Sequence, residues 1–314
     1  MSLRILVHCL CISIVLNFVL AIFLYKNSPE IRTATEYRES QHKYPLLSKR
    51  ILQEFPQDIL INFLDLRKDL RSQTTPFHDS FGFYFEYLPT GTSLGVNEKD
   101  EFHAASLFKI PVIMAYYHGK ERMKNTQDPT LTIQKDQLDN QFGDLWKKGA
   151  GTKLKASEAI NLAIKESDNT AVKAIIPLIQ EEDFQSVYEG LDIDLQVDKE
   201  GALISAKNYS SILKSLYFSS VLSKNSSEEI LDNLTKTKFP DKLAAGVPQD
   251  IVVAHKIGDF VDDKGNEGFR DCGIVYVPRR PYLLCMFSVG DEQTARDRMQ
   301  AVSKTIYDYV ASQK

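Results

Sequence analysis

The sequence predicts a mixed α/β (α+β) fold in which one antiparallel sheet is built from both ends of a domain. Strand-like segments occur near residues 81–99 and return only after residue 250. Nearly every segment from 105 to about 236 has a helical pattern, and amphipathic segments precede the first strands and follow the last. The economical arrangement is one sheet flanked by the terminal helices, with an all-helical subdomain (about 116–245) inserted between its strands.

Length and composition are those of an ordinary globular protein. The chain has 314 residues, of which 43% are apolar and 25% are charged, enough to bury a sizeable core. The net charge is -4 and no basic run suggests a nucleic-acid-binding surface. Nucleic acid is therefore not an expected partner.

An uninterrupted apolar run, ILVHCLCISIVLNFVLAIFLY, occupies residues 5–25. As a helix it would be about 30 Å long, the hydrocarbon thickness of a bilayer. It ends in FLYKNSPE, without the small-residue cleavage site of a secretory signal. We expect residues 1–26 to be a transmembrane signal-anchor, with a cleaved signal peptide as the alternative. Arg4 before the run favours a cytoplasmic N-terminus.

The polar, aperiodic residues 27–44 predict a stalk, and residues 45–314 predict the folded domain. The domain begins with a helical pattern of apolar residues, namely Ile59, Ile61, Leu64, Leu66 and Leu70. FGFYFEYL (81–88) and TSLGVNEK (92–99) then predict two strands joined at the turn PTG. The domain therefore opens with a helix followed by a β-hairpin.

Further patterns specify the middle and the end of the domain. KASEAINLAIKES places Ala156, Ile160, Ala163 and Ile164 on one helical face. Ser226 and Glu229 match a capping box at the start of another helix. The late strands are expected at 250–258, 270–277 and 282–289. The final helix has apolar residues at helical spacing, namely Ala295, Met299, Val302, Ile306 and Val310.

The cysteines and histidines do not indicate a metal site or a cofactor. Cys9 and Cys11 lie inside the apolar run, while Cys272 and Cys285 lie in strand-like segments, where a disulfide and buried free thiols are both open. The six histidines show no H-x-H or H-E-x-x-H grouping. We expect neither a metal ion nor a cofactor.

Three short polar motifs occur in an order that carries chemistry. Ser106-Leu-Phe-Lys109 is an S-x-x-K, which on its own is typical of a helix-start serine followed by a snorkelling lysine. Ser167-Asp168-Asn169 is an S-D-N between two helical segments, and Lys256-Ile-Gly258 ends a late strand. S-x-x-K, S-D-N and K-[TS]-G in this order mark the penicilloyl-serine enzymes.

With these motifs, residues 45–314 resemble the β-lactamase class A-like serine hydrolases of the penicillin-binding protein superfamily. The resemblance implies a β-lactamase/transpeptidase-like fold and a catalytic set of Ser106, Lys109, Ser167 and Lys256. Ser106 would attack an amide or lactam carbonyl after Lys109, its pKa lowered by burial and nearby cations, takes the serine proton. Ser167 would relay a proton to the leaving nitrogen, and Lys256 would attract the substrate carboxylate.

The resemblance also implies substrate-binding residues: Asn169, Gly258 and Asp259. Asn169 would hydrogen-bond the substrate amide, and Gly258 belongs to the K-I-G strand. The backbone N–H groups of Ser106 and Asp259 would form an oxyanion hole, worth roughly 3–4 kcal/mol per donor. Asp168 is expected to be a structural hydrogen-bonding residue.

The chain departs from the family pattern at two places. Ile257 replaces the hydroxyl residue that hydrogen-bonds the substrate carboxylate, and losing such a bond costs about 1.5–3 kcal/mol. Arg270 is a possible substitute, although a solvated arginine at the start of a strand is the simpler interpretation. The E-x-x-L-N loop that supplies a deacylating glutamate is also missing. Glu200 gives only E-x-x-L with Ile204 after it, and Glu166 is expected to face solvent.

The sequence therefore predicts a membrane-anchored acyl-serine hydrolase that opens β-lactams or related D-alanyl peptide amides through a Ser106 acyl-enzyme. A penicillin-binding D-Ala-D-Ala peptidase with slow deacylation is one alternative. A wall-peptide binding or sensor module without turnover is the other. Expected partners are a β-lactam or a peptidoglycan peptide, and the membrane through the N-terminal helix. The catalytic domain is expected outside the cytoplasmic membrane, because the family's substrates occur there.

Overall fold

The computed structural model describes residues 13, 15–20, 23–25, 45–46, 61–194, 196–199, 201–261 and 263–313. The chain separates into two units, Met1–Phe55 and Pro56–Lys314, and the second contains the sheet and the candidate site. In the first unit, residues 15–20 and 23–25 are helical. Among all the described residues, none of the helices is both long enough and apolar enough to cross a bilayer.

Several predicted boundaries are not decided by this structure. The predicted anchor (1–26) and stalk (27–44) fall mostly outside the described residues. They remain predictions, as do the domain limits at 45–314 and the subdomain limits at about 116–245.

The main sheet is antiparallel and is built from both ends of the domain, as predicted. β1 (Phe81–Tyr87) and β2 (Thr92–Val96) form the predicted hairpin. The late segments form β8 (Val253–Val261), β9 (Glu267–Val275) and β10 (Tyr282–Val289). The strand order is β2-β1-β10-β9-β8, so β1 pairs directly with β10 and β8 is an edge strand.

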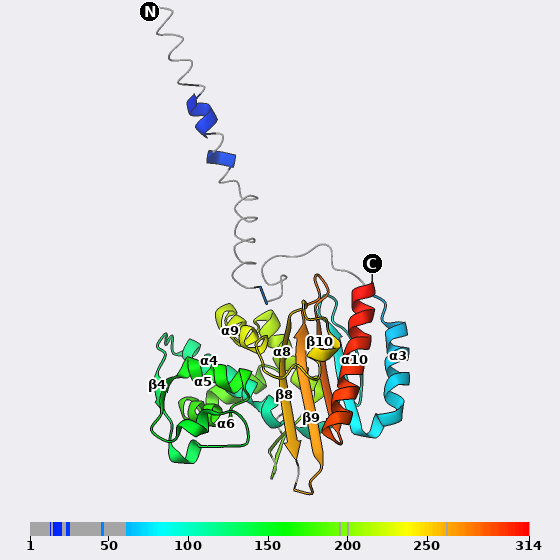
Figure 1. The fold of residues 1–314 in the computed structure, drawn as a ribbon. Coiled ribbons are helices and arrows are strands. Elements are labelled where there is room, and N and C mark those ends of the chain that lie inside the picture. Colours follow the sequence, from blue (N-terminus) through cyan, green and yellow to red (C-terminus); the bar gives the residue numbers. More distant parts are fainter. Residues whose placement is uncertain are drawn as a thin grey trace, which may run out of the picture. The chain divides into compact units, whose positions relative to one another are not determined.

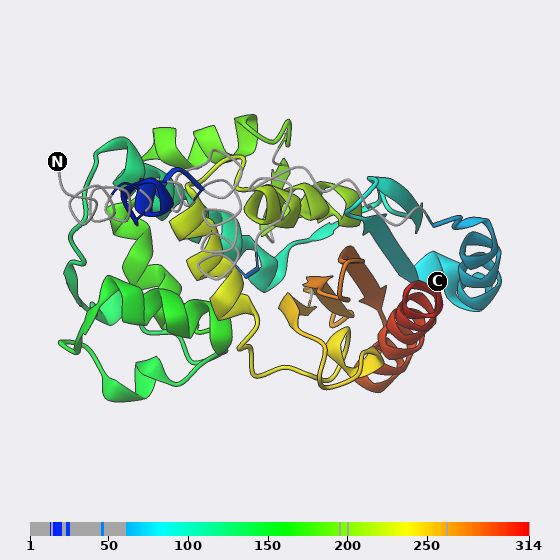
Figure 2. The same ribbon diagram turned by 90° about the horizontal axis from the view of Figure 1, so that it is seen from above.

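The terminal helices α3 (Leu64–Thr74) and α10 (Glu292–Ser312) cover one face of this sheet (Figures 1 and 2). Alternate residues of β1 point into this face, because successive side chains of a strand point to opposite sides. The apolar residues predicted for α10 are all buried here. The cluster includes Phe81, Phe83, Phe85, Leu66, Leu70, Leu284, Met286, Ala295, Met299, Val302, Ile306 and Val310.

The opposite face of the sheet carries α8 (Ala206–Phe218). Glu86 points to this side and is buried, but its carboxylate accepts hydrogen bonds from Lys214 of α8 at 3.0 Å and from the Tyr84 hydroxyl at 2.9 Å. Such partners offset the cost of burying a charge. Cys272 and Cys285 face each other across β9 and β10 as buried free thiols, which decides between the two open alternatives.

Helices dominate the segment between β3 and β8. They are α4 (Lys109–Arg122), α5 (Ala156–Lys165), α6 (Asn169–Ile175), α7 (Glu181–Glu189), α8 and α9 (Lys224–Leu234). The segment is not uniformly helical, because strands too short to show an alternating pattern also occur in it. β4 (Thr130–Thr132) pairs with β5 (Lys153–Lys155), while β7 (Gly201–Ser205) pairs with β6 (Gln196–Asp198) and with β3 (Glu101–His103).

The buried face of α5 is the predicted one, formed by Ala156, Ile160, Ala163 and Ile164. Short 3₁₀ turns connect the helices and strands. The turns are η2 (Thr75–Ser80), η3 (Ala105–Phe108), η4 (Lys135–Gln137), η5 (Leu145–Lys148), η6 (Ile176–Leu178) and η7 (Ala244–Gly246). Of these, η3 is the one that positions the S-x-x-K motif.

The predicted capping box at Ser226 and Glu229 is wrong. α9 begins one turn earlier, with Ser223 as its N-cap, whose hydroxyl accepts the Ser226 N–H at 3.4 Å. Ser226 is buried and donates its own hydroxyl to Glu121 at 2.5 Å. The segment SKNS offers two serines three residues apart, and the pattern alone does not distinguish which one starts the helix.

Candidate active site

Ser106, the predicted nucleophile, lies in η3, the turn that leads into α4. Ala105 before it has φ of 48°, in the left-handed region that L-residues seldom adopt. The turn is held from α8, because the Tyr209 hydroxyl donates to the Leu107 carbonyl at 3.2 Å. Ser106 is half-buried while Leu107 and Lys109 are buried, so the serine is the more accessible polar group of the motif.

Lys109 is the first residue of α4 and is only 6% exposed. Its Nζ donates to Ser167 Oγ at 3.1 Å, to Asn169 Oδ1 at 2.6 Å and to the Ser167 carbonyl. Burial lowers the pKa of Lys109 to about 7, although Asp168 and Asp139 act in the opposite direction. A buried amine with this pKa has the property a general base needs at neutral pH.

Ser167 is fully buried and lies between two lysines. Its Oγ accepts from Lys109 at 3.1 Å and from Lys256 at 2.8 Å. A hydroxyl has two lone pairs and one proton, so two accepted bonds leave the proton for a third partner. Ser167 also has φ of 55°, a conformation that persists only where the surrounding structure holds it. The S-D-N turn thus presents one hydroxyl to both lysines.

Lys256 lies on the edge strand β8 and is fully buried. Besides Ser167, its Nζ donates to the Ile257 carbonyl at 3.1 Å. Burial and, next, the neighbouring charge of Lys109 hold the pKa of Lys256 well below its ordinary value. The charge of Lys109 therefore opposes protonation of Lys256, which favours a neutral amine at this position.

Asp168 and Asn169 organise the start of α6. Asp168 accepts the Ala171 N–H at 2.7 Å and the Leu145 N–H at 2.8 Å, which is the structural role predicted for it. Asn169 donates its Nδ2 to Asp139 at 3.0 Å while its Oδ1 accepts from Lys109. Asn169 is thereby fixed beside the lysine.

Gly258 allows β8 to approach the nucleophile turn closely. A Cβ on Gly258 would lie 2.9 Å from the Ala104 carbonyl oxygen and 3.3 Å from the Leu107 nitrogen. Both are backbone atoms, which cannot move aside as the end of a side chain can, so only glycine fits without a shift of the turn. Asp259 follows it on the same strand. The structure therefore brings Lys109, Ser167, Asn169 and Lys256 together by hydrogen bonds, and sets Ser106 and Gly258 on adjoining segments. The chemical roles of these residues remain predictions.

A groove of about 760 Å³ adjoins this cluster, a volume in the usual range for small-ligand sites. Asp259 lies in it with Lys242, whose Nζ is 3.5 Å from Asp259 Oδ1 and 3.8 Å from Asp241 Oδ1. Lys242 is 2% exposed. The groove is lined by Gln141, Phe142, Phe239, Asp241, Lys242, Asp259, Phe260, Val261, Glu267, Phe269, Glu292 and Arg296.

Sequence reasoning missed Lys242 and misplaced Arg270. Lys242 belongs to no motif, and only its neighbours Leu243 and Ala244 hint that it is buried. Arg270 was expected to be solvated, and this is wrong. It lies inside β9, is 3% exposed, and pairs in register with Gly258. Ile257 is 1% exposed and offers no hydroxyl to the site, as its sequence indicates.

The segment that contains the E-x-x-L sequence of Glu200 lies between α7 and α8. Between α7 and α8 the chain forms the β6–β7 hairpin, and Gly201 donates its N–H to Asp198 at 3.1 Å in the turn. Glu200, the weak candidate for a deacylating base, lies outside the described residues. Glu166 is partly exposed and accepts from Lys238 at 2.6 Å, so it is engaged at the surface.

No cluster of three or more histidine, cysteine or acidic side chains suited to a metal occurs among the described residues. The groups gathered at the site are a hydroxyl, two amines and an amide, which suit acyl transfer by acid–base chemistry.

Comparison with solved structures gives relatives of the same fold. PBP-A is 25% identical with a TM-score of 0.69, covering 78% of this chain and 95% of that one. A PBP-A variant in an acyl-enzyme complex with penicillin G is 23% identical with a TM-score of 0.70, covering 81% and 98%. A β-lactamase from Chitinophaga pinensis is 22% identical with a TM-score of 0.70, covering 78% and 98%. A comparison with curated proteins gives no match.

A family model identifies the chain more directly than these structures do. The model for the beta-lactamase enzyme family matches residues 65–310, which include all three motifs and the whole main sheet. The predicted resemblance is thereby confirmed. The chain belongs to the beta-lactamase enzyme family, within the serine hydrolases of the penicillin-binding protein superfamily.

Proposed function

We propose that this chain forms an acyl-enzyme on Ser106 and opens β-lactams or D-alanyl peptide amides. The observation that carries the proposal is the Ser167 hydroxyl held between the buried amines of Lys109 and Lys256. A structural hydroxyl has no need of two desolvated lysines, each of which costs free energy to bury. The cost is understandable if the amines exchange protons with a substrate.

These positions support the following proposed reaction. Neutral Lys109 takes the Ser106 proton, and Ser106 Oγ attacks the carbonyl carbon to form a C–O bond. When the C–N bond breaks, Ser167 gives its free proton to the leaving nitrogen and regains one from the lysines. The product is an ester on Ser106. A water molecule then hydrolyses this ester and returns the enzyme to its starting state.

Deacylation is proposed to be slow. The segment between α7 and α8 forms the β6–β7 hairpin, and its sequence lacks the E-x-x-L-N of the class A glutamate loop. Without the glutamate of that loop to activate water, the second step loses general-base assistance, typically worth roughly 10²–10⁴-fold. The chain would then behave like a penicillin-binding peptidase.

The test is intact-mass measurement of the full chain after exposure to labelled penicillin, followed over time. Penicillin G is a suitable probe because a structurally similar PBP-A variant forms an acyl-enzyme with it. We expect wild-type protein to gain one penicilloyl group and Ser106→Ala to gain none. The matched control is Ser220→Ala, which removes a serine of the loop between α8 and α9 and should leave labelling intact. Equal labelling of wild type and Ser106→Ala would refute the assignment of Ser106 as the nucleophile.

One observation favours a second candidate, a wall-peptide binding module without turnover. Ile257 removes the hydroxyl expected to bind a carboxylate, and Lys242 is already close to the carboxylates of Asp259 and Asp241. Both features weaken recognition of an anionic substrate. Sustained turnover of a chromogenic cephalosporin or an ester, abolished in Lys109→Ala, would exclude this candidate.

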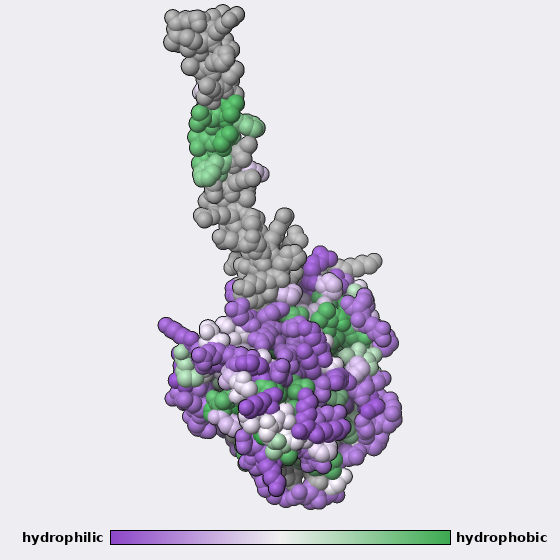
Figure 3. All heavy atoms as spheres, turned by 60° about the vertical axis from the view of Figure 1, so that its left-hand side comes forward, coloured by the Kyte–Doolittle hydropathy of each residue, from purple (hydrophilic) through white to green (hydrophobic). Residues whose placement is uncertain are grey.

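Membrane anchoring is part of the proposal. The described residues of the apolar run are helical, and their large side chains are exposed and hydrophobic (Figure 3). These side chains are Val15, Leu16, Phe18, Val19, Leu20, Phe23, Leu24 and Tyr25. An apolar surface of this kind is typical of membrane contact. We propose a single-pass protein with its N-terminus in the cytoplasm and its catalytic domain outside.

Protease treatment of intact spheroplasts tests this topology. We expect loss of the domain and survival of a small membrane fragment. Full protection of the domain would place it in the cytoplasm and refute the proposal. A mature N-terminus near residue 27, found by sequencing, would instead identify the run as a cleaved signal peptide.

A further inference from the structure

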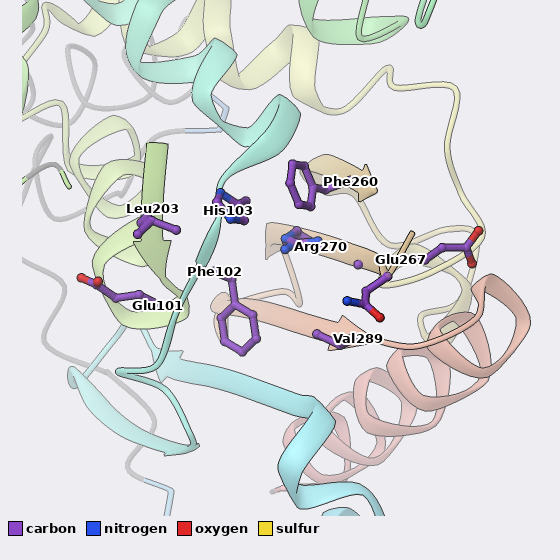
Figure 4. Close-up of a pocket in the computed structure, with 10 residues that line it drawn as sticks. Glu101, Phe102, His103, Leu203, Phe260, Glu267, Arg270 and Val289 are labelled. Atoms are coloured by element: carbon purple, nitrogen blue, oxygen red, sulfur yellow. The ribbon is translucent and has the colours of Figure 1, made fainter. Parts of the chain in front are cut away.

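A second, smaller cavity lies beside the nucleophile turn, outside the lysine cluster. It has a volume of about 180 Å³ and lies between β3 and β7 on one side and β8, β9 and β10 on the other (Figure 4). His103, Phe260 and Arg270 lie close together in its centre, with Leu203 of β7 at one side. His103 is three residues before Ser106, and Phe260 directly follows Asp259.

Arg270 is a buried cation, and two of its guanidinium nitrogens have no hydrogen-bond partner among the described residues. The residue is 3% exposed, and its Nε and Nη1 are buried and donate to no described residue. The guanidinium contacts the Phe260 ring, with Cζ 5.7 Å from the ring centroid. Such a contact offsets only part of the cost of burying a charge. Burial lowers the pKa of Arg270 to about 10, although the charge of Asp259 acts in the opposite direction, and the group stays charged at neutral pH.

The surroundings keep this cation available. Gly268 makes room for it, because a Cβ there would lie 2.2 Å from Arg270 Nη1. The acidic residues at the cavity, Glu101 and Glu267, are exposed and lie at its two ends, away from the guanidinium (Figure 4). Among the described residues, no carboxylate lies within ion-pair distance of Arg270. The other basic side chain of the cavity, His103, does have an acidic neighbour, because its Nε2 is 3.6 Å from Asp198 Oδ2.

The shape of the site selects the ligand. A guanidinium presents parallel N–H donors that match the two oxygens of a carboxylate. A cavity of 180 Å³ holds a few non-hydrogen atoms beside the planar group. Phe102, Leu203 and Phe260 supply apolar walls, which suit a short aliphatic chain rather than a heavily hydrated phosphate.

We propose that this cavity is a carboxylate-binding site, separate from the acyl groove, in which Arg270 pairs with the carboxylate of a small aliphatic acid or of a substrate side chain. The site adjoins η3 through β3 and adjoins the K-I-G strand through Phe260. A bound carboxylate therefore stabilises the two segments that flank Ser106.

Thermal unfolding of the full chain tests the proposal with acetate as the probe, against sodium chloride at matched ionic strength. A ligand that binds only the folded state raises the melting temperature, and the rise grows with the logarithm of the ligand concentration once that exceeds Kd. We expect acetate to stabilise wild-type protein and to have no specific effect on Arg270→Met. Arg270→Met should itself be no less stable than wild type without acetate, because an apolar side chain replaces an unpaired charge.

Two further variants keep the test decisive if Arg270→Met folds poorly. Gly268→Ala keeps the charge but displaces the guanidinium, so it should abolish the acetate effect. Arg298→Met is the matched control, since Arg298 also lies over a phenylalanine, with Cζ 4.7 Å from the Phe77 centroid, but has the Ser80 hydroxyl as partner. It should respond to acetate as wild type does. Equal acetate effects in wild type, Arg270→Met and Gly268→Ala would overturn the site.

Nuclear magnetic resonance of ¹⁵N-arginine-labelled protein reads the guanidinium directly. The Arg270 Nε–H signal, assigned by its loss in Arg270→Met, should shift and saturate on titration with acetate. An unmoved signal would overturn the proposal even if acetate stabilises the fold. Repeating the titration on penicilloylated protein distinguishes the two possible sources of the carboxylate, a free aliphatic acid and the substrate. Lost acetate binding assigns the carboxylate to the substrate, and retained binding assigns it to a free acid.

Discussion

Two regions of the molecule bury side chains of opposite character: the sheet face covered by α3 and α10, and the site beside the edge strand β8. On the helix-covered face, apolar residues such as Phe85, Leu284 and Met299 are fully buried against one another. At the edge of β8, the buried groups include Lys109 and Lys256, which share one hydroxyl. The first region lowers the free energy of folding, whereas the second raises it by desolvating charge.

The difference teaches where stability and activity reside in this fold. Two residues of the site have left-handed backbone, namely Ala105 beside Ser106 and Ser167 within the polar cluster. Strained backbone and buried amines persist only because the apolar face supplies a surplus of stability. Removing a group from the cluster should therefore impair chemistry without unfolding the protein, and removing one from the apolar face should do the reverse.

The largest effect is expected for Lys109→Met. Acylation should slow by roughly 10²–10⁴-fold, because the general base for Ser106 is lost. The free energy of unfolding should stay equal or rise, since an apolar side chain replaces a desolvated amine. Penicillin labelling by intact mass and urea denaturation measure the two quantities.

Lys236→Met is the control for that variant, because Lys236 is an exposed lysine paired with Asp232 at 2.6 Å. It should change neither quantity appreciably. If Lys109→Met acylates at the wild-type rate, Lys109 is not the base. If it unfolds far more easily than wild type, the division between the two regions is wrong.

The next effect is expected on the apolar face. Leu284→Ala should lower the free energy of unfolding by about 2–5 kcal/mol, because it leaves a cavity in the sheet core. The acylation rate of the folded fraction should be unchanged. Leu64→Ala on α3 is the same substitution at a side chain that is 56% exposed, and it should cost far less. Equal destabilisation by both variants would contradict the comparison.

The pH dependence of acylation is expected to follow Lys109. Its pKa is lowered to about 7, and only the neutral amine accepts a proton, so the rate should rise with pH and level off above neutrality. At about pH 5 the rate should be roughly a hundredfold below its plateau, as for a single group titrating near neutrality. Stopped-flow acylation between about pH 5 and 9 measures the profile. A flat profile, or a midpoint near the ordinary lysine pKa, would exclude Lys109 as the base.

Much of this comparison is visible in the sequence. The apolar alternation of β1 and the helical spacing of α10 are local properties, so the sheet and its covering helices were predictable. Ser106, Lys109, Ser167 and Lys256 were found because motif order constrains them jointly. The structure then supplied what motifs lack, namely that both lysines meet at a single hydroxyl.

The errors have one physical origin. Whether Arg270 is solvated depends on segments far away in the chain. Lys242 is buried beside Asp259 of β8 as well as beside its neighbour Asp241. Arg270 is covered by β3, which precedes it by well over a hundred residues. The wrong N-cap of α9 likewise depends on Glu121, which binds Ser226 from α4. Such long-range contacts leave no periodic signal in a short window of sequence.

The smallest effect is expected where the two regions overlap, at Asp168. This residue belongs to the S-D-N motif, yet it stabilises the fold by accepting N–H groups from Ala171 and Leu145. Asp168→Ala should lower the free energy of unfolding by about 0.5–2 kcal/mol, the usual cost of a lost helix cap. Asp168→Asn keeps one acceptor oxygen and should recover part of that loss.

The rate of acylation should distinguish Asp168→Ala from Lys109→Met. Because the Asp168 oxygens accept backbone N–H groups of Ala171 and Leu145 and accept from neither lysine, the folded fraction of Asp168→Ala should still acylate. A moderate decrease in rate is expected, since Asn169 beside it loses some of its positioning. Hydrogen exchange should show the loss of protection confined to α6 and residues 141–146, with the sheet unaffected. Loss of acylation as complete as in Lys109→Met would make Asp168 a reactant, and would extend the catalytic cluster into what is here assigned to structure.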